Sequence, residues 1–225
     1  MSMKRKIGIG LLCLVLVIGG GGLWLYQYLF HNLDEETKER IDAEIGSITS
    51  DVQQQIREKK EQLEQGETSE GDTPDSDASN NESGELSEEA SQVITNNTES
   101  LNQKTTALLN IYYSGMKELE GQGNAIVNQL LSNAKKDYQN VKSSGGGKTE
   151  LLSLASAYSN QASAMESGLD ASVEGLLSEL RSDLVEEGVS ASDADAIISQ
   201  LRSEYKNKKQ TRYNEVYAQF QAVLK

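Results

Sequence analysis

The chain has 225 residues, of which 36% are hydrophobic and 5% aromatic, with one cysteine and one histidine. These counts exclude a disulfide framework and metal centres built from several cysteines or histidines. With 21 basic and 35 acidic residues, the formal net charge is −14. This charge argues against nucleic acid as a partner, because affinity for nucleic acid depends on neutralising its phosphates.

The N-terminus has the pattern of a transmembrane signal anchor. Lys4, Arg5 and Lys6 precede an uncharged, mostly apolar run over residues 7–30. A helix of this length is long enough to cross a hydrocarbon core of about 30 Å. Because basic flanks favour the cytoplasmic side, residues 1–6 are expected to be cytoplasmic and the rest of the chain after the span extracytoplasmic. Membrane lipid is the expected contact of residues 7–30.

A cleaved signal peptide is the alternative interpretation of this segment. Signal peptides share the basic start, but their apolar region is shorter and ends in small residues. Gly19 to Gly22 could form such an end, yet the apolar run continues through residues 23–30. An uncleaved anchor is therefore favoured.

Residues 31–65 carry the apolar stripe of an amphipathic helix. Aliphatic residues recur at intervals of three or four, at Ile41, Ile45, Ile48, Val52 and Ile56. Two interpretations fit this narrow stripe. The segment could be a helical stalk that pairs with a second copy of the chain, giving a homodimer, or a solvated helix that extends the membrane helix.

Residues 66–86 are expected to form a disordered acidic linker. They hold seven acidic residues, no basic residue and the only proline of the chain. Such a composition buries too little apolar surface to offset the entropy lost on ordering. Asp75 and Asp77 resemble the start of a calcium loop, but Asn80 occupies the position of the required glycine, so no metal site is expected.

Residues 87–225 have helical apolar patterns throughout, which predict an extracytoplasmic all-α domain that folds on its own. Three stripes are separated by the glycines at 145–147 and by Gly188, and Ser190 is the expected N-cap of the third helix. The expected fold is an elongated antiparallel three-helix bundle. Its first helix would span about 55 residues at about 1.5 Å each and project past the other two.

The first stripe also allows a different number of helices. It contains Gly115, Gly121 and Gly123, and each glycine inside a helix costs roughly 1 kcal/mol. A single continuous helix is favoured because the apolar phase crosses the glycines without a slip. A break near Gly121 is the alternative, and it would give a four-helix bundle.

Charge predicts that the last two helices pair with each other. Residues 148–187 carry eight acidic and two basic residues, whereas residues 192–225 carry four acidic and six basic residues. An antiparallel hairpin would place Arg202 near Glu174 and Glu179. The same hairpin would bring basic side chains near acidic ones at a second position, with Lys208 and Arg212 near Glu166 and Asp170.

No group of residues indicates catalysis. Gly147, Lys148 and Thr149 resemble the end of a phosphate-binding loop, but Lys142 replaces the first glycine and the preceding stretch is helical. An inter-helix turn is the expected structure there. The only histidine, His31, lies beside the expected membrane span, where it has no nucleophile to activate. We therefore expect a protein that is not an enzyme and that has no cofactor.

Two sets of residues are candidates for binding. The projecting part of the first helix would expose Val93, Ile94 and Leu101 to a partner. Alternatively, extracytoplasmic tyrosines could line a ligand groove, with Tyr112, Tyr158 and Tyr205 as candidates. Tyrosines at helical spacing more often pack with the ring buried and the hydroxyl at the rim.

The plan as a whole suits an envelope protein of a Gram-positive bacterium, with a single pass through the cell membrane. The expected function is a scaffold or adaptor that presents a helical bundle to an unknown envelope protein. The alternative is a sensory or ligand-binding ectodomain with a tyrosine-lined groove.

Overall fold

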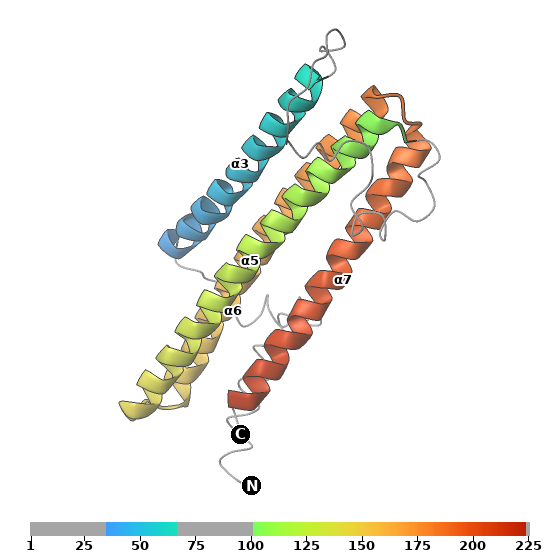
Figure 1. Cartoon of the computed structure of the whole chain (residues 1–225). Coiled ribbons are helices and arrows are strands. Elements are labelled where there is room, and N and C mark those ends of the chain that lie inside the picture. The colour runs from blue at the N-terminus through green and yellow to red at the C-terminus, as the bar shows by residue number, and fades with distance from the viewer. Residues whose placement is uncertain (1–34, 67–100, 224–225) are drawn as a thin grey trace, which may run out of the picture. The chain divides into compact units, whose positions relative to one another are not determined.

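The computed structural model describes residues 35–66 and 101–223, and within these ranges it contains helices and no strand (Figure 1). The four helices are α3 (Glu35–Gly66), α5 (Gln103–Ser143), α6 (Lys148–Glu186) and α7 (Ala191–Val223). The expected all-α class is thus confirmed for this part of the chain. The span expected at residues 7–30 lies outside the described residues, and no helix within them is long and apolar enough to cross a membrane.

Helix α5 is continuous, as favoured from the sequence, and the break near Gly121 is wrong. Its start differs from the expected one. The backbone N–H of Thr105 donates to Oδ1 of Asn102 at 2.9 Å, which makes Asn102 the N-cap. Leu101 therefore precedes the helix, and α5 has 41 residues rather than about 55. Its length is close to the 39 residues of α6.

Glycine turns end α5 and α6, as their sequences predict. Gly145 and Gly188 have φ angles of 78° and 90°, a left-handed conformation that glycine adopts without a steric penalty. The N–H of Val189 donates to the carbonyl of Leu184, five residues earlier, at 3.0 Å. This is the bond of a Schellman motif that spans more residues. The N–H of Asp193 then donates to Oγ of Ser190 at 3.2 Å, so the expected cap of the next helix is confirmed.

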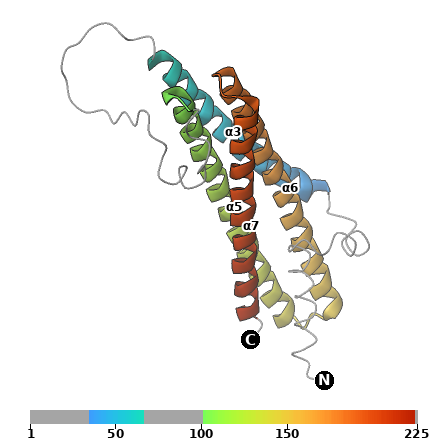
Figure 2. The ribbon, with the colours of Figure 1, turned by 90° about the vertical axis from the view of Figure 1, so that its right-hand side faces the viewer.

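Figure 2 shows the four described helices as continuous ribbons, and their residues divide into two compact units. Of the described residues, the first unit contains 35–47, 121–170 and 208–223, and the second contains 48–66, 101–120 and 171–207. Each unit therefore includes a segment of every described helix, and each has its own buried side chains.

The second unit has a core of large aliphatic side chains around one tyrosine. These side chains come from all four helices and are less than 2% exposed: Val52, Leu109, Tyr112, Leu119, Leu176, Leu177, Leu180, Leu184, Ile197 and Leu201. Burial of one such side chain contributes about 1.5–3 kcal/mol. The predicted apolar stripes thus correspond to the buried faces of the helices.

The first unit contains two smaller clusters. In one, Leu131 of α5 packs with Val216 of α7, and Tyr158 of α6 packs against them. In the other, Ile41 and Ile45 of α3 pack with Met165 of α6, together with partly buried side chains at Ile126, Val127, Ala164 and Leu169.

Helix α3 packs into both units, which differs from the expectation of a separate stalk. In the first unit Ile45 fills the notch at Gly168, where an added Cβ would lie 2.8 Å from its Cδ1. In the second unit Ile56 fills the notch at Gly115, where an added Cβ would lie 2.7 Å from its Cδ1. Oγ1 of Thr49 also lies 2.7 Å from Oγ of Ser172.

The described part of the chain therefore has four packed helices, but the additional helix is α3, which precedes the acidic linker. It does not arise from a break in α5, which was the four-helix alternative. The stripe of α3 is buried within this chain, with Val52 and Ile56 only 1% and 3% exposed, and pairing with a second copy stays a prediction. Residues 67–100 therefore connect two helices that pack together.

Candidate functional site

The first candidate for the ligand groove, Tyr112, belongs to the core of the second unit. Its side chain is 1% exposed, and its hydroxyl donates to Oδ2 of Asp183 at 2.7 Å. Nζ of Lys60 lies 2.5 Å from the same carboxylate oxygen and 5.8 Å from the centre of the Tyr112 ring. Burial, followed by the bond to Asp183, raises the pKa of Tyr112 above its ordinary value. This tyrosine fixes α3, α5 and α6 to one another.

The other two candidate tyrosines also lie among the helices. Tyr158 of the first unit donates to Oδ2 of Asp137 at 2.7 Å, and burial together with this bond raises the pKa of Tyr158. Tyr205 is half-buried on α7 in the second unit. The side chains of Tyr112 and Tyr158 thus hold helices together, which is the packing alternative that the tyrosine spacing allowed.

Ion pairs join α6 to α7, as the charge pattern predicts. Nε and Nη2 of Arg202 each donate to Glu174 at 2.7 Å, and these bonds lower the pKa of Glu174. Lys209 also pairs with Glu166 and Asp170, at 2.6 and 2.7 Å, a contact of the predicted kind at a residue that was not named.

Lys208 and Lys209 differ by one residue along the helix, which is a rotation of about 100°, and the charge pattern did not single out Lys209. Arg212 instead donates to Asn128 of α5 and to Glu215 of its own helix. The charge pattern predicted the pairing of the helices but not the exact face that α7 presents.

Groups suited to metal binding do not gather in the part of the chain that the structure describes. Within residues 35–66 and 101–223, no three His, Cys, Asp or Glu side chains could hold a metal ion. Helix α5 ends at Ser143 and helix α6 begins at Lys148. The glycines between them therefore form an inter-helix turn, and a helix precedes them instead of the strand that a phosphate-binding loop requires. Val93 and Ile94 lie outside the described residues, and Leu101 is half-buried just before α5.

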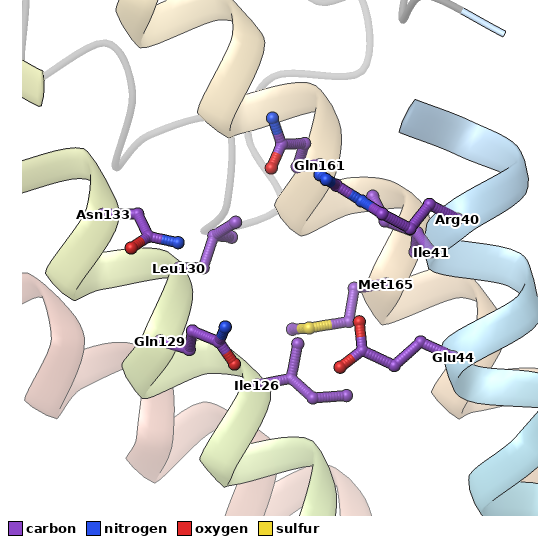
Figure 3. A pocket seen from close by; sticks show the side chains of 9 residues that line it. All are labelled: Arg40, Ile41, Glu44, Ile126, Gln129, Leu130, Asn133, Gln161 and Met165. Carbon is purple, nitrogen blue, oxygen red and sulfur yellow. The ribbon is translucent and has the colours of Figure 1, made fainter. Parts of the chain in front are cut away.

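A pocket of about 220 Å³ opens in the first unit between α3, α5 and α6 (Figure 3). We call it the α3–α5–α6 pocket. Four aliphatic side chains line it, namely Ile41, Ile126, Leu130 and Met165. Five polar side chains, from all three helices, complete the lining: Arg40, Glu44, Gln129, Asn133 and Gln161. Figure 3 shows these side chains around one hollow.

The polar side chains of this pocket lie at its surface side. Arg40, Glu44, Gln129 and Asn133 are exposed and Gln161 is half-buried. None of the five forms a hydrogen bond or an ion pair with another described residue, in contrast to Tyr112 and Lys209, whose polar atoms are bonded across helices. With respect to the described residues, these groups are available to a ligand.

Sequence analysis missed this pocket because it depends on the position of α3. Arg40 and Glu44 lie on a segment that was expected to be separate from the bundle, so nothing placed them near α5 or α6. The signal that could have revealed the contact is the set of helix-interior glycines. Gly115 and Gly168 each weaken a helix, and an added Cβ at either would meet a side chain of α3, whereas Gly121 and Gly175 have nothing within 4 Å.

Neither protein-family models, nor curated proteins, nor solved structures give a match to this chain.

Proposed function

We propose that this protein is a membrane-anchored extracytoplasmic scaffold or adaptor that binds an envelope protein. The proposal takes the span at residues 7–30 and its orientation from the sequence. Only residues 31–34 separate that span from α3, which begins at Glu35. A helix so close to the span would hold the packed helices at the outer face of the membrane.

The packing of α3 on α5 and α6 is the observation that carries this proposal. Because both ends of residues 67–100 join packed helices, this acidic segment would be a long excursion from them. Helix–helix connections in bundles usually have about 2–8 residues, and much longer ones are usually functional or disordered. We therefore assign partner binding to this segment, with Val93 and Ile94 as its apolar contacts and Leu101 at its end.

Site-specific photo-crosslinking in intact cells tests the assignment. A photoreactive amino acid at Val93 of the full chain should give a discrete adduct with another envelope protein. The same residue at Asp51, an exposed position on α3, is the matched control and should give none. Replacing Ile94 and Leu101 with serine should weaken the Val93 adduct. No adduct from Val93, or equal adducts from both positions, would contradict the proposal.

A ligand-binding role is the second candidate. Tyr112 does not support a tyrosine-lined groove, because its side chain is buried and bonded to Asp183. The α3–α5–α6 pocket favours ligand binding at a different place, through polar side chains that are not used in packing.

A further inference from the structure

Two charged side chains line the α3–α5–α6 pocket, one basic and one acidic, on adjacent turns of α3. Arg40 and Glu44 are four residues apart, so they are neighbours on one helix face. A guanidinium binds a carboxylate through two parallel hydrogen bonds, and a carboxylate accepts hydrogen bonds from an ammonium. The lining has no net charge, so it suits a ligand that carries both charges on neighbouring atoms.

The apolar part of the lining suits an aliphatic group. Ile41 and Met165 are buried at 9% and 6% exposure, and Ile126 and Leu130 are half-buried. The unbranched, polarisable side chain of methionine adapts to irregular shapes. No aromatic side chain is among the described residues that line the pocket, so it offers no face on which a nucleobase could stack.

The size of the pocket limits the ligand further. Its volume of about 220 Å³ is below the range of about 300–1,000 Å³ that is typical of sites for drug-sized ligands. A single amino acid is of a size that fits this space.

We propose that the α3–α5–α6 pocket binds a free α-amino acid with an aliphatic side chain. The ligand carboxylate bonds to Arg40, its ammonium bonds to Glu44, and its side chain lies on Ile126 and Met165. The amides of Gln129, Asn133 and Gln161 both donate and accept, so they complete the bonding of the ligand's charged end. This inference is independent of the scaffold proposal, since it involves none of residues 67–100.

Isothermal titration of the purified full chain, in detergent, tests the proposal with L-leucine and L-methionine as probes. Two analogues of leucine remove one charge each: 4-methylpentanoate lacks the ammonium, and 3-methylbutylamine lacks the carboxylate. We expect saturable binding of the amino acids and at least about tenfold weaker binding of each analogue, equivalent to about 1.4 kcal/mol. No binding of either amino acid at millimolar concentration, or equal binding of the analogues, would overturn the proposal.

Four variants locate the site. Arg40→Gln and Glu44→Gln should each weaken leucine binding at least about tenfold. Arg57→Gln and Glu39→Gln remove the same charges from exposed positions of α3 outside the pocket and should leave the affinity unchanged. The melting temperature of each variant without ligand shows whether it is folded. Affinity that is unaffected by the pocket variants, or lowered equally by the controls, would place binding elsewhere.

Discussion

The polar side chains of the second unit show how a few residues determine which helices pair. Tyr112 and Lys60 converge on Asp183, so one carboxylate joins three helices. The side chain of Asp183 is half-buried, at 18% exposure, so its hydrogen bonds are only partly replaced by water when a partner is removed. The arrangement therefore favours this packing over others that would bury the same apolar surface.

Removing the Tyr112 hydroxyl should destabilise the protein. In Tyr112→Phe the ring still fills its place, but Asp183 loses a donor, so the free energy of unfolding should fall by about 1–3 kcal/mol. Tyr138→Phe is the control, because Tyr138 is half-buried and its hydroxyl forms no hydrogen bond with another described residue. Urea unfolding of both variants provides the measurement. Equal midpoints for the two would contradict the assigned role.

The pair between Arg202 and Glu174 predicts a pH dependence. Because Arg202 lowers the pKa of Glu174, the carboxylate stabilises the fold above its ordinary pKa, and this contribution is lost as the pH falls through the lowered pKa. The side chain of Glu174 is 50% exposed, so Glu174→Gln should cost at most about 1 kcal/mol at neutral pH.

Denaturant unfolding at neutral and acidic pH measures this contribution. The difference in free energy of unfolding between the natural chain and Glu174→Gln should disappear as the pH falls below about 4.3, the ordinary pKa of glutamate. Glu61→Gln removes the same charge from an exposed site of α3 and serves as the control. A gap that widens in acid would show that the sign is wrong.

At the scale of the helix, sequence alone identified the buried faces, the turns and the cap of α7, but not the start of α5. Ser190 and Gly188 act by local geometry, which the sequence displays directly. Gly168 is different, because its role depends on the side chain of Ile45 from a helix more than a hundred residues away. Such a contact has no local signature beyond the glycine itself.

Two glycines of α6 should respond in opposite ways to alanine. In Gly168→Ala the new Cβ would lie 2.8 Å from Cδ1 and 3.2 Å from Cγ2 of Ile45, and the β-branched side chain has few rotamers with which to yield. This variant should be destabilised. Gly175→Ala has nothing within 4 Å of its Cβ and should gain up to about 1 kcal/mol from helix propensity. The melting temperatures of the two variants provide the measurement. An equal gain in stability for Gly168→Ala and Gly175→Ala would contradict the close contact between Gly168 and Ile45.

At the scale of the molecule, the sequence predicted the fold class and three of the helices, but it separated α3 from them. The reason is that an amphipathic stripe shows that a face is buried and not what covers it. The acidic composition of residues 66–86 also resembles a tether between independent parts. The α3–α5–α6 pocket was missed for the same reason, since Arg40 and Glu44 depend on that contact.

The position of α3 also changes the expectation for fragments. Without α3, residues 87–225 would expose the surfaces that cover Ile45 and Val52, which are 4% and 1% exposed in the chain. Exposed apolar patches of this kind lead to association or loss of stability. The fragment is therefore expected to need α3 for full stability.

Cutting the chain between α3 and α5 measures whether α3 packs with α5 and α6. A site-specific protease sequence inserted between Asn80 and Asn81 of the full chain, with an affinity tag before α3, allows cleavage under native conditions. After cleavage, the fragment with α5, α6 and α7 should stay bound to the tagged fragment and separate only in denaturant. Replacing Ile45 and Val52 with aspartate should release it at once. Release from the unsubstituted chain without denaturant would show that α3 does not pack on these helices.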